Sequence, residues 1–232
     1  MKTYKRTGYL AGEVVKLVDN LGKNAVVCDI ATDHGYIAEE ISKNSKVKKV
    51  IATDISKKSL SKLEKLILKN NLKKIETRLG DGLNPIEKAD VAVIAGIGGW
   101  EIIKMISEQN TLDKNRKIDL FVLQPTQNFI DLRRFLFEND IFVISDKIIK
   151  DENRYYIVLV IDVSKKQRNE KNIFNLWLGR DNDINDSDFR DYLIDIQKFL
   201  VFLNSIPKEK IEQDDDLQEK YNLKILVDKL LS

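Results

Sequence analysis

Acidic, glycine and polar residues follow a series of short apolar runs in the first half of the sequence. Asp29 lies at the end of the run 25–30, and Asp54 ends the run 49–54. Further along, Gly80-Asp81-Gly82, the glycine-rich loop 95–99 and Gln124-Pro125 follow three more runs. Carboxylates at such places accept hydrogen bonds from ribose hydroxyls or an amino group, and glycines let a ligand approach the backbone closely. Taken singly, these residues could be helix caps or turn residues. Together they predict a site for an adenosine-containing cofactor.

Two common nucleotide-binding motifs are absent from the sequence. The loop after the first run reads DIATDHGY and lacks the GxGxxG pattern of nicotinamide dehydrogenases. No GxxxxGK[ST] loop is present, which disfavours ATP chemistry. The lone histidine, His34, is either a structural residue or part of the site.

The apolar runs alternate with stretches of helical spacing, and this alternation predicts the fold. Strands are expected at 25–30, 49–54, 75–79, 91–95 and 119–124, and helices at 33–43, 56–70, 100–107 and 129–139. Such alternation is typical of a doubly wound α/β fold with a parallel sheet and helices on both faces. No helix separates the strands expected at 141–149 and 154–163, so these should pair antiparallel. Ligands of such sheets bind at the carboxyl ends of the strands, where the strand order reverses.

The character of the sequence changes after residue 163. A polar stretch, 164–172, is predicted as a linker. Apolar residues then repeat at three- and four-residue steps over 188–206, and Pro207 separates this stripe from a second one over 217–230. The pattern predicts an α-helical hairpin, either a cap that packs on the main domain or an arm for a large substrate. We therefore divide the chain into a cofactor-binding domain, 1–163, and a helical hairpin domain, 164–232.

The charge balance, the cysteine count and the absence of long apolar runs limit the class of protein to which this chain can belong. The sequence has 39 Lys and Arg against 37 Asp and Glu, so a polyanionic partner would require the basic residues to gather on one face. A single cysteine rules out an internal disulfide and a cysteine-rich metal site. Neither a signal-peptide stretch nor a run of membrane-spanning length is seen. We expect a monomeric cytoplasmic protein that needs no metal and does not associate with a membrane.

Four segments of the sequence resemble those of one known family. The segments DIATDHGY, RLGDGL, VIAGIGG and LQPTQNFIDLRRFLFEND resemble the bacterial tRNA (adenine-N1)-methyltransferases that modify position 22 of tRNA. The resemblance covers about residues 3–163, and the hairpin is similar to the family's C-terminal coiled coil in pattern only. It implies a Rossmann-like methyltransferase sheet, S-adenosylmethionine as cofactor and tRNA as partner. Ala31, Ile97 and Thr126 depart from the Gly, Met and Asn expected at these positions.

The resemblance and the strand-end positions assign roles to three sets of residues. The expected catalytic residues are Asp33, His34 and Gln124. The expected cofactor-binding residues are Asp29, Ala31, Thr32, Gly35, Asp54, Ile55, Asp81, Gly82, Ala95 and Gly96. The expected RNA contacts are Arg6, Arg133 and Arg154 to phosphates, and Tyr9 and Tyr36 as stacking groups. The lysine-dense stretch 46–74 is interpreted mainly as solvated surface.

The expected reaction needs no strong base. The N1 atom of adenine has a free lone pair, so catalysis consists mainly of positioning and desolvation. A carboxylate such as Asp33 would offset the positive charge that develops on the ring, with His34 and Gln124 orienting the base. Two alternatives stay open: a methyltransferase for a small metabolite, and a non-catalytic cofactor-binding protein that interacts with RNA.

Overall fold

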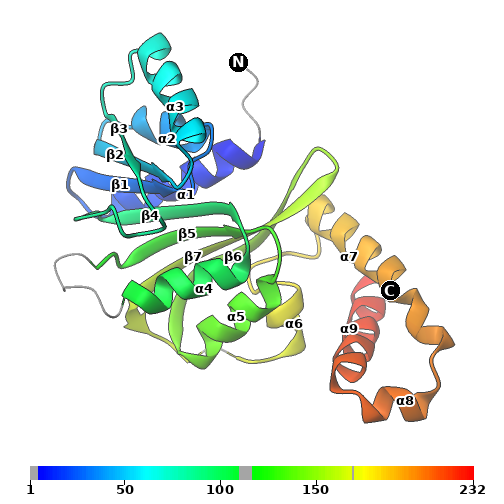
Figure 1. Ribbon diagram of the computed structural model, residues 1–232. Helices are drawn as coiled ribbons and strands as arrows, with labels where there is room; N and C mark the ends of the chain where they lie inside the picture. Colours follow the sequence, from blue (N-terminus) through cyan, green and yellow to red (C-terminus); the bar gives the residue numbers. More distant parts are fainter. Residues whose placement is uncertain (1–4, 110–116, 169) are drawn as a thin grey trace.

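The structure is a computed structural model that describes residues 5–109, 117–168 and 170–232. Its centre is a seven-stranded sheet with the order β3-β2-β1-β4-β5-β7-β6 (Figure 1). The strands are β1 (Ala25–Ile30), β2 (Val47–Asp54), β3 (Ile75–Leu79), β4 (Val91–Ile97), β5 (Leu120–Pro125), β6 (Ile141–Asp151) and β7 (Arg154–Lys166). Neighbouring strands from β3 to β5 pair in parallel, and β7 runs antiparallel to both β5 and β6. The predicted parallel sheet and the antiparallel final pair are confirmed.

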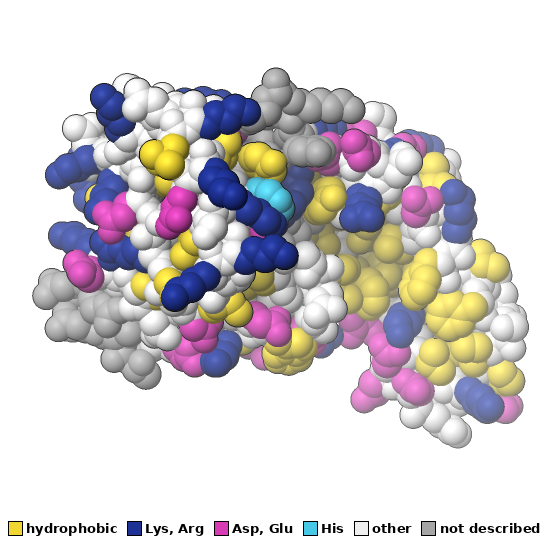
Figure 2. Space-filling view, turned by 45° about the horizontal axis from the view of Figure 1, so that its top comes forward, with side chains coloured by type: hydrophobic (Ala, Val, Ile, Leu, Met, Phe, Trp, Pro, Cys, Tyr) yellow, Lys and Arg dark blue, Asp and Glu magenta, His cyan; other side chains and the backbone are white. Residues whose placement is uncertain are grey.

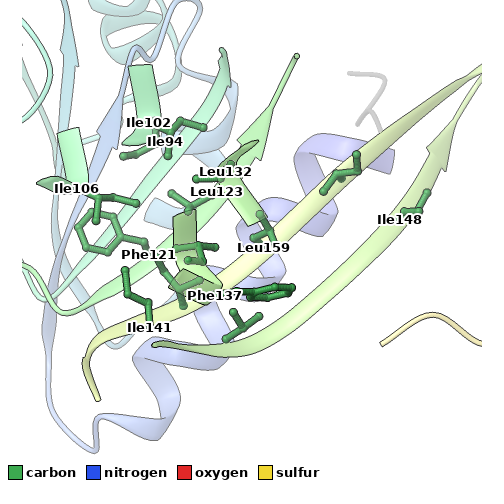
Figure 3. Packing of buried hydrophobic residues seen from close by; sticks show 14 of the residues in the cluster. Ile94, Ile102, Ile106, Phe121, Leu123, Leu132, Phe137, Ile141, Ile148 and Leu159 are labelled. Atoms are coloured by element: carbon green, nitrogen blue, oxygen red, sulfur yellow. The ribbon is translucent and has the colours of Figure 1, made fainter. Parts of the chain in front are cut away.

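Helices cover both faces of this sheet. One face carries α1 (Lys5–Asn20), α2 (Tyr36–Ser42) and α3 (Lys57–Asn70), and the other carries α4 (Gly99–Glu108) and α5 (Phe129–Glu138). Alternate residues of β4 point to opposite faces, as the two-residue period of a strand requires: Val91 and Val93 join one buried cluster, Ala92 and Ile94 the other. Figure 3 shows the second cluster, where Ile94 packs among side chains of α4, α5 and β5. The predicted doubly wound arrangement is thereby confirmed.

The C-terminal region is helical, with more elements than the sequence predicted. Its helices are α6 (Ile173–Trp177), α7 (Ser187–Leu200), the 3₁₀ segment η3 (Val201–Ser205), α8 (Lys208–Gln213) and α9 (Asp215–Leu231). The expected linker begins inside β7, and α6 was not predicted. The expected helix 188–206 leaves α geometry at Leu200 and tightens into η3 ahead of Pro207. Helices α7 and α9 pack on each other as the predicted hairpin (Figure 1).

An ion pair buried beneath α5 joins this region to the sheet. Arg133 is fully buried and makes a bidentate contact with Asp146 of β6, at 2.9 Å from Nε and 2.6 Å from Nη2. Its Nη1 donates to the carbonyls of Leu176 and Trp177, at 3.0 and 3.1 Å. The predicted phosphate contact of Arg133 is therefore wrong. The residue occupies the inward stripe of α5 beside Leu132, where it meets a buried carboxylate and cannot reach an RNA backbone.

None of the described helices is both long enough and apolar enough to cross a bilayer.

Candidate active site

A pocket of about 400 Å³ opens at the carboxyl ends of β1 and β4, the point where the strand order reverses. This is the place where open α/β sheets bind their ligands. Its lining comes from five parts of the chain: Arg6 and Thr7; Asp29, Ala31, Thr32, Asp33, His34, Tyr36 and Ile37; Ala95 and Gly96; Gln124 and Thr126; and Arg154 and Tyr156. The three expected catalytic residues thus share one pocket with five of the expected cofactor-binding residues.

The loop after β1 is held in an unusual backbone conformation. Ala31, Asp33 and Gly35 all have positive φ, at 56°, 47° and 73°. Gly35 is required there, because a Cβ atom would lie 2.2 Å from Cδ1 of Leu63 on α3. Ala31 and Asp33 have no such freedom, and a side chain in the left-handed region costs free energy. The tertiary structure therefore forces this loop into its shape, and the loop forms one wall of the pocket.

Asp29 is a buried carboxyl group at the base of the pocket. Its Oδ2 accepts a hydrogen bond of 2.6 Å from the Thr32 hydroxyl. Burial raises the pKa of Asp29 to about 7, although the Thr32 hydrogen bond works against that shift. Asp29 therefore exchanges a proton near neutral pH. A cation bound in the pocket would favour its ionised form.

Asp54 ends β2 beside the pocket and connects two loops. Its Oδ2 accepts from the backbone N–H of Asp33 at 3.1 Å, and its Oδ1 accepts from that of Ser56 at 2.8 Å. Each oxygen keeps a second lone pair, so the carboxylate can still accept hydrogen bonds from a pair of hydroxyl groups. The next residue, Ile55, is 73% exposed and offers an apolar surface at the same strand end.

Asp81 and Gly82 line a different cavity, also of about 400 Å³, together with residues of α4 such as Glu101 and Met105. These two expected cofactor-binding residues are therefore not among the lining residues of the main pocket. Their loop is tied to the end of β2, since the N–H of Gly80 donates to the carbonyl of Asp54 at 3.1 Å.

Asp33 and His34 form a polar cluster at the pocket rim with Lys62 of α3. His34 Nδ1 lies 2.6 Å from Asp33 Oδ2, and Lys62 Nζ lies 3.3 Å from His34 Nε2. A lysine ammonium can only donate, so these partners assign Nε2 as the acceptor and Nδ1–H as the donor to Asp33. The His34 ring stacks on Tyr36, with centroids 5.5 Å apart. Figure 2 shows Lys and Arg side chains gathered around this single histidine.

The cluster keeps Asp33 ionised. Burial acts to raise the pKa of Asp33, but the hydrogen bond from His34 and the positive charge of Lys62 work against it, and the net effect lowers that pKa. Asp33 is therefore a negative charge at neutral pH that faces the pocket. The sequence offered no signal for Lys62, because its contact with His34 joins two elements that only the fold brings together.

Gln124 is oriented by Arg6. The Arg6 Nε donates to Gln124 Oε1 at 2.8 Å, and Gln124 Nε2 donates to the carbonyl of Pro125 at 2.8 Å. The Arg6 guanidinium also lies over the ring of Tyr156, 5.2 Å from its centroid. Burial lowers the pKa of Arg6, with Tyr156 and Asp151 opposing the shift. The Arg6 side chain is thus half-buried and bound to other groups of the protein. Arg154, in contrast, is an exposed residue of the pocket.

The remaining expected site residue, Tyr9, is not among the residues that line the pocket. Burial and the neighbouring Glu13 raise the pKa of Tyr9 to about 12, and the ring packs against the apolar cluster beneath α1 and α2. Tyr36 is 41% exposed and remains the aromatic ring available at the rim. Within the described ranges, no group of three His, Cys, Asp or Glu residues is arranged to hold a metal ion.

Curated relatives of the chain carry names from tRNA methylation. A tRNA (adenine(22)-N(1))-methyltransferase of Bacillus subtilis is 29% identical over 160 residues, which are 68% of this chain and 66% of that protein. A Mycoplasma genitalium protein whose name assigns it provisionally to the tRNA methyltransferases is 34% identical over 146 residues, 61% of this chain and 63% of its own. The aligned part thus spans just under two thirds of the length of these relatives.

Solved structures match the fold over its whole length. The M. capricolum TrmK, in complex with S-adenosyl-homocysteine, superposes with a TM-score of 0.77, covers 100% of both chains and is 22% identical. The B. subtilis M1A22 tRNA methyltransferase TrmK gives a TM-score of 0.71 at 22% identity, covering 100% of this chain and 99% of that one. At these identities the likeness establishes a shared fold, including the C-terminal helices.

The family model described as "Methyltransferase domain" matches residues 12–159, from the middle of α1 to β7. That range includes most of the pocket lining and all three expected catalytic residues. Because it covers more than half of the sequence, the chain belongs to the methyltransferase domain family.

Proposed function

We propose that this protein transfers a methyl group from S-adenosylmethionine to N1 of an adenine in tRNA, at position 22. The observation that carries the proposal is the convergence of Asp33, His34 and Gln124 on the pocket at the strand-order reversal. The name of the Bacillus subtilis relative supports the choice of substrate and position.

The pocket and its surroundings fit the cofactor. Asp54 has free lone pairs for the two ribose hydroxyls, and the exposed Ile55 can pack on an adenine face. Asp29 supplies a negative charge for the cationic methionine end, and Gly96, with φ 79°, allows close approach to the backbone. Asp81, one loop further along at a neighbouring cavity, would accept a hydrogen bond from the adenine amino group. When bound, S-adenosylmethionine supplies an electrophilic methyl group on a positively charged sulfur.

The protein's own contribution is to position the base and offset charge. The ionised Asp33 faces the space where the target adenine would lie and would stabilise the positive charge that its ring acquires. Gln124, fixed by Arg6, can orient the base, and Tyr36 can stack on it. Because N1 lies on the pairing edge, the target nucleotide must be unpaired or flipped out of its stack.

The Asp33→Asn variant distinguishes a catalytic role of Asp33 from a role in cofactor binding. Asp33→Asn keeps the shape of the side chain and removes its charge. We expect near-normal cofactor affinity and a single-turnover methylation rate reduced by roughly a hundredfold, the scale of losing one preorganised electrostatic group. A wild-type rate at saturating cofactor would transfer the catalytic role to Gln124 and His34.

We further propose that residues 1–163 carry the catalytic and cofactor groups, and that 164–232 form a helical hairpin domain. All pocket-lining residues precede residue 164, which supports this division. We propose a monomer acting in the cytoplasm, where tRNA is modified, since one chain supplies every group of the pocket. A sedimentation-velocity run that gives a stable dimer would contradict the monomer.

The experiment that tests the function is methyl transfer from tritiated S-adenosylmethionine. The acceptors are unmodified tRNA, free nucleosides and a metabolite extract, each offered separately. We expect label in tRNA alone. Label in the metabolite fraction would indicate a small-molecule methyltransferase. Cofactor and RNA binding without any transfer would indicate a non-catalytic protein.

A further inference from the structure

Four lysines form a stripe along α3. Lys58, Lys62, Lys65 and Lys69 follow one another at steps of four, three and four residues, and all four are exposed. At about 100° per residue these positions fall within an arc of roughly 60° on one side of the helix. The core-facing residues of α3, Leu60 and Leu63, lie on another side. We call these four residues the lysine stripe.

Within the described ranges, acidic side chains pair with only one lysine of the stripe. The only acid of α3 is Glu64, which lies about 130° around the helix from the centre of the stripe and accepts a hydrogen bond from Thr77. Among the described residues, the one ion pair of the stripe joins Lys62 to Asp33 at 3.6 Å. Like charges at three- and four-residue spacing repel each other, so the stripe does not serve helix stability.

Some lysines elsewhere on the same half of the molecule are paired, whereas others, such as Lys48 and Lys73, have no ion pair among the described residues. Lys23 contacts Asp90 at 2.6 Å, and Lys46 contacts Asp19 at 3.1 Å. A solvated helix face usually intersperses charges of both signs in this way. The stripe differs from these lysines because its four like charges lie along one face of a helix and reach the pocket residue His34, and such a concentrated positive surface suits a polyanionic partner.

The stripe begins at the rim of the candidate active site. Lys62 lies 3.3 Å from His34 Nε2, and the neighbouring Ser59 hydroxyl donates to Asp33 at 3.4 Å. Asp33 and His34 both line the pocket. On the face shown in Figure 2, basic side chains surround that histidine. A polyanion on the stripe would therefore extend directly to the pocket.

The length of the stripe suits several nucleotides. Eleven residues separate Lys58 from Lys69, which at 1.5 Å per residue is about 16 Å. A stripe of this length can lie against several successive phosphates of one RNA strand. Resting on the proposed function, we propose that the lysine stripe binds the phosphate backbone of the RNA strand next to the target nucleotide, while the pocket receives its base.

The test removes three charges and leaves the residue that touches His34. The stripe variant is Lys58→Gln/Lys65→Gln/Lys69→Gln, because Gln is a polar, uncharged residue with a helix propensity close to that of Lys. The matched control is Lys48→Gln/Lys73→Gln/Lys88→Gln. These three lysines are equally exposed and lie near the amino ends of β2, β3 and β4, at the sheet edge opposite the pocket.

Binding of unmodified tRNA is measured by fluorescence anisotropy over a series of KCl concentrations. Each lost phosphate contact should lower the slope of log affinity against log salt by about 0.7. We expect the stripe variant to lose about two units of slope and at least roughly tenfold in affinity at low salt. The control should keep the wild-type slope. Calorimetry should give the same S-adenosylmethionine affinity for all three proteins, which shows that the pocket is intact.

The experiment distinguishes failure of the stripe inference from failure of the proposed catalytic function. If the wild-type protein methylates tRNA but the stripe variant binds it as the control does, the stripe inference is overturned and the function stands. If the stripe variant loses tRNA affinity but the wild-type protein transfers no methyl group, the stripe stands and the catalytic function is overturned. A stripe variant that keeps tRNA binding but loses affinity for poly-glutamate would show that the stripe serves an acidic protein instead.

Discussion

Replacing Arg133 by Met removes the cation of the ion pair between α5 and β6 and leaves Asp146 in a fully buried site. The side chains of both partners are 0% exposed, so water cannot replace the guanidinium. Four hydrogen bonds are lost together: two to the Asp146 carboxylate and two to the carbonyls of Leu176 and Trp177. Burial already raises the pKa of Asp146, with Arg133 opposing the shift, so the variant strands an unfavourable charge.

Removing one partner of such a pair typically costs about 3–5 kcal/mol. That is a large part of the roughly 5–15 kcal/mol by which a folded domain is stable. For a chain of this size, the same loss lowers the melting temperature by about 6–20 °C. The free energy of unfolding is measured by urea titration followed by circular dichroism, with linear extrapolation to water.

The neighbouring residue provides the control. Arg134 makes an ion pair with Glu219 at 3.2 Å, but its side chain is 41% exposed. Arg134→Met should therefore cost less than about 1 kcal/mol. The double variant Arg133→Met/Asp146→Leu should recover part of the loss, since it removes the stranded charge. If Arg133→Met costs no more than Arg134→Met but weakens tRNA binding, the buried-pair account is refuted and the phosphate contact expected from the sequence is restored.

Three further outcomes concern the pocket. Asp54→Ala should weaken S-adenosylmethionine binding by about ten- to a hundredfold, because two charge-assisted hydrogen bonds are lost; unchanged affinity by calorimetry would reject its ribose role. Ala31→Gly should raise the melting temperature by about 1–4 °C, because it relieves a φ of 56°, whereas Ala38→Gly inside α2 should lower it. The pKa of Asp29 is about 7 in the folded protein against an ordinary 3.8, so the folded state binds the extra proton between these values and loses stability as the pH rises through them. From pH 5 to pH 8 the free energy of unfolding of the wild type should therefore fall by about 2–3 kcal/mol more than that of Asp29→Asn. Equal pH profiles of the two proteins in urea titrations would show that the pKa of Asp29 is not raised.

The sheet and much of the pocket were predictable because both follow from local patterns. Apolar runs of strand length marked the five parallel strands, and the absence of a helix after 149 marked the antiparallel pair. Polar residues directly after these runs had to meet at one sheet edge, which is where Asp33, His34 and Gln124 converge. Such inferences need only the spacing of apolar residues along the sequence and the geometry of parallel strands.

The errors concern side chains whose partners are distant in the sequence. Arg133 is a predicted phosphate contact, but in the structure Asp146 and the carbonyl of Leu176, 13 and 43 residues away, hold its guanidinium in the core. The position of Arg133 beside Leu132, on the inward side of α5, is the feature of the sequence that indicates burial. Lys62 shows the reverse case: a lysine interpreted as solvated surface contacts His34 across 28 residues.

The most direct test of the central claim is mass spectrometry of the nucleosides released from tRNA after reaction with S-adenosylmethionine. Two unmodified transcripts are compared, one with adenine at position 22 and one with guanine there. Methylation at N1 of this adenine predicts one 1-methyladenosine per molecule of the first transcript and none in the second. Methylation of both transcripts, methyl groups on another base or another atom, or no product from either would contradict it.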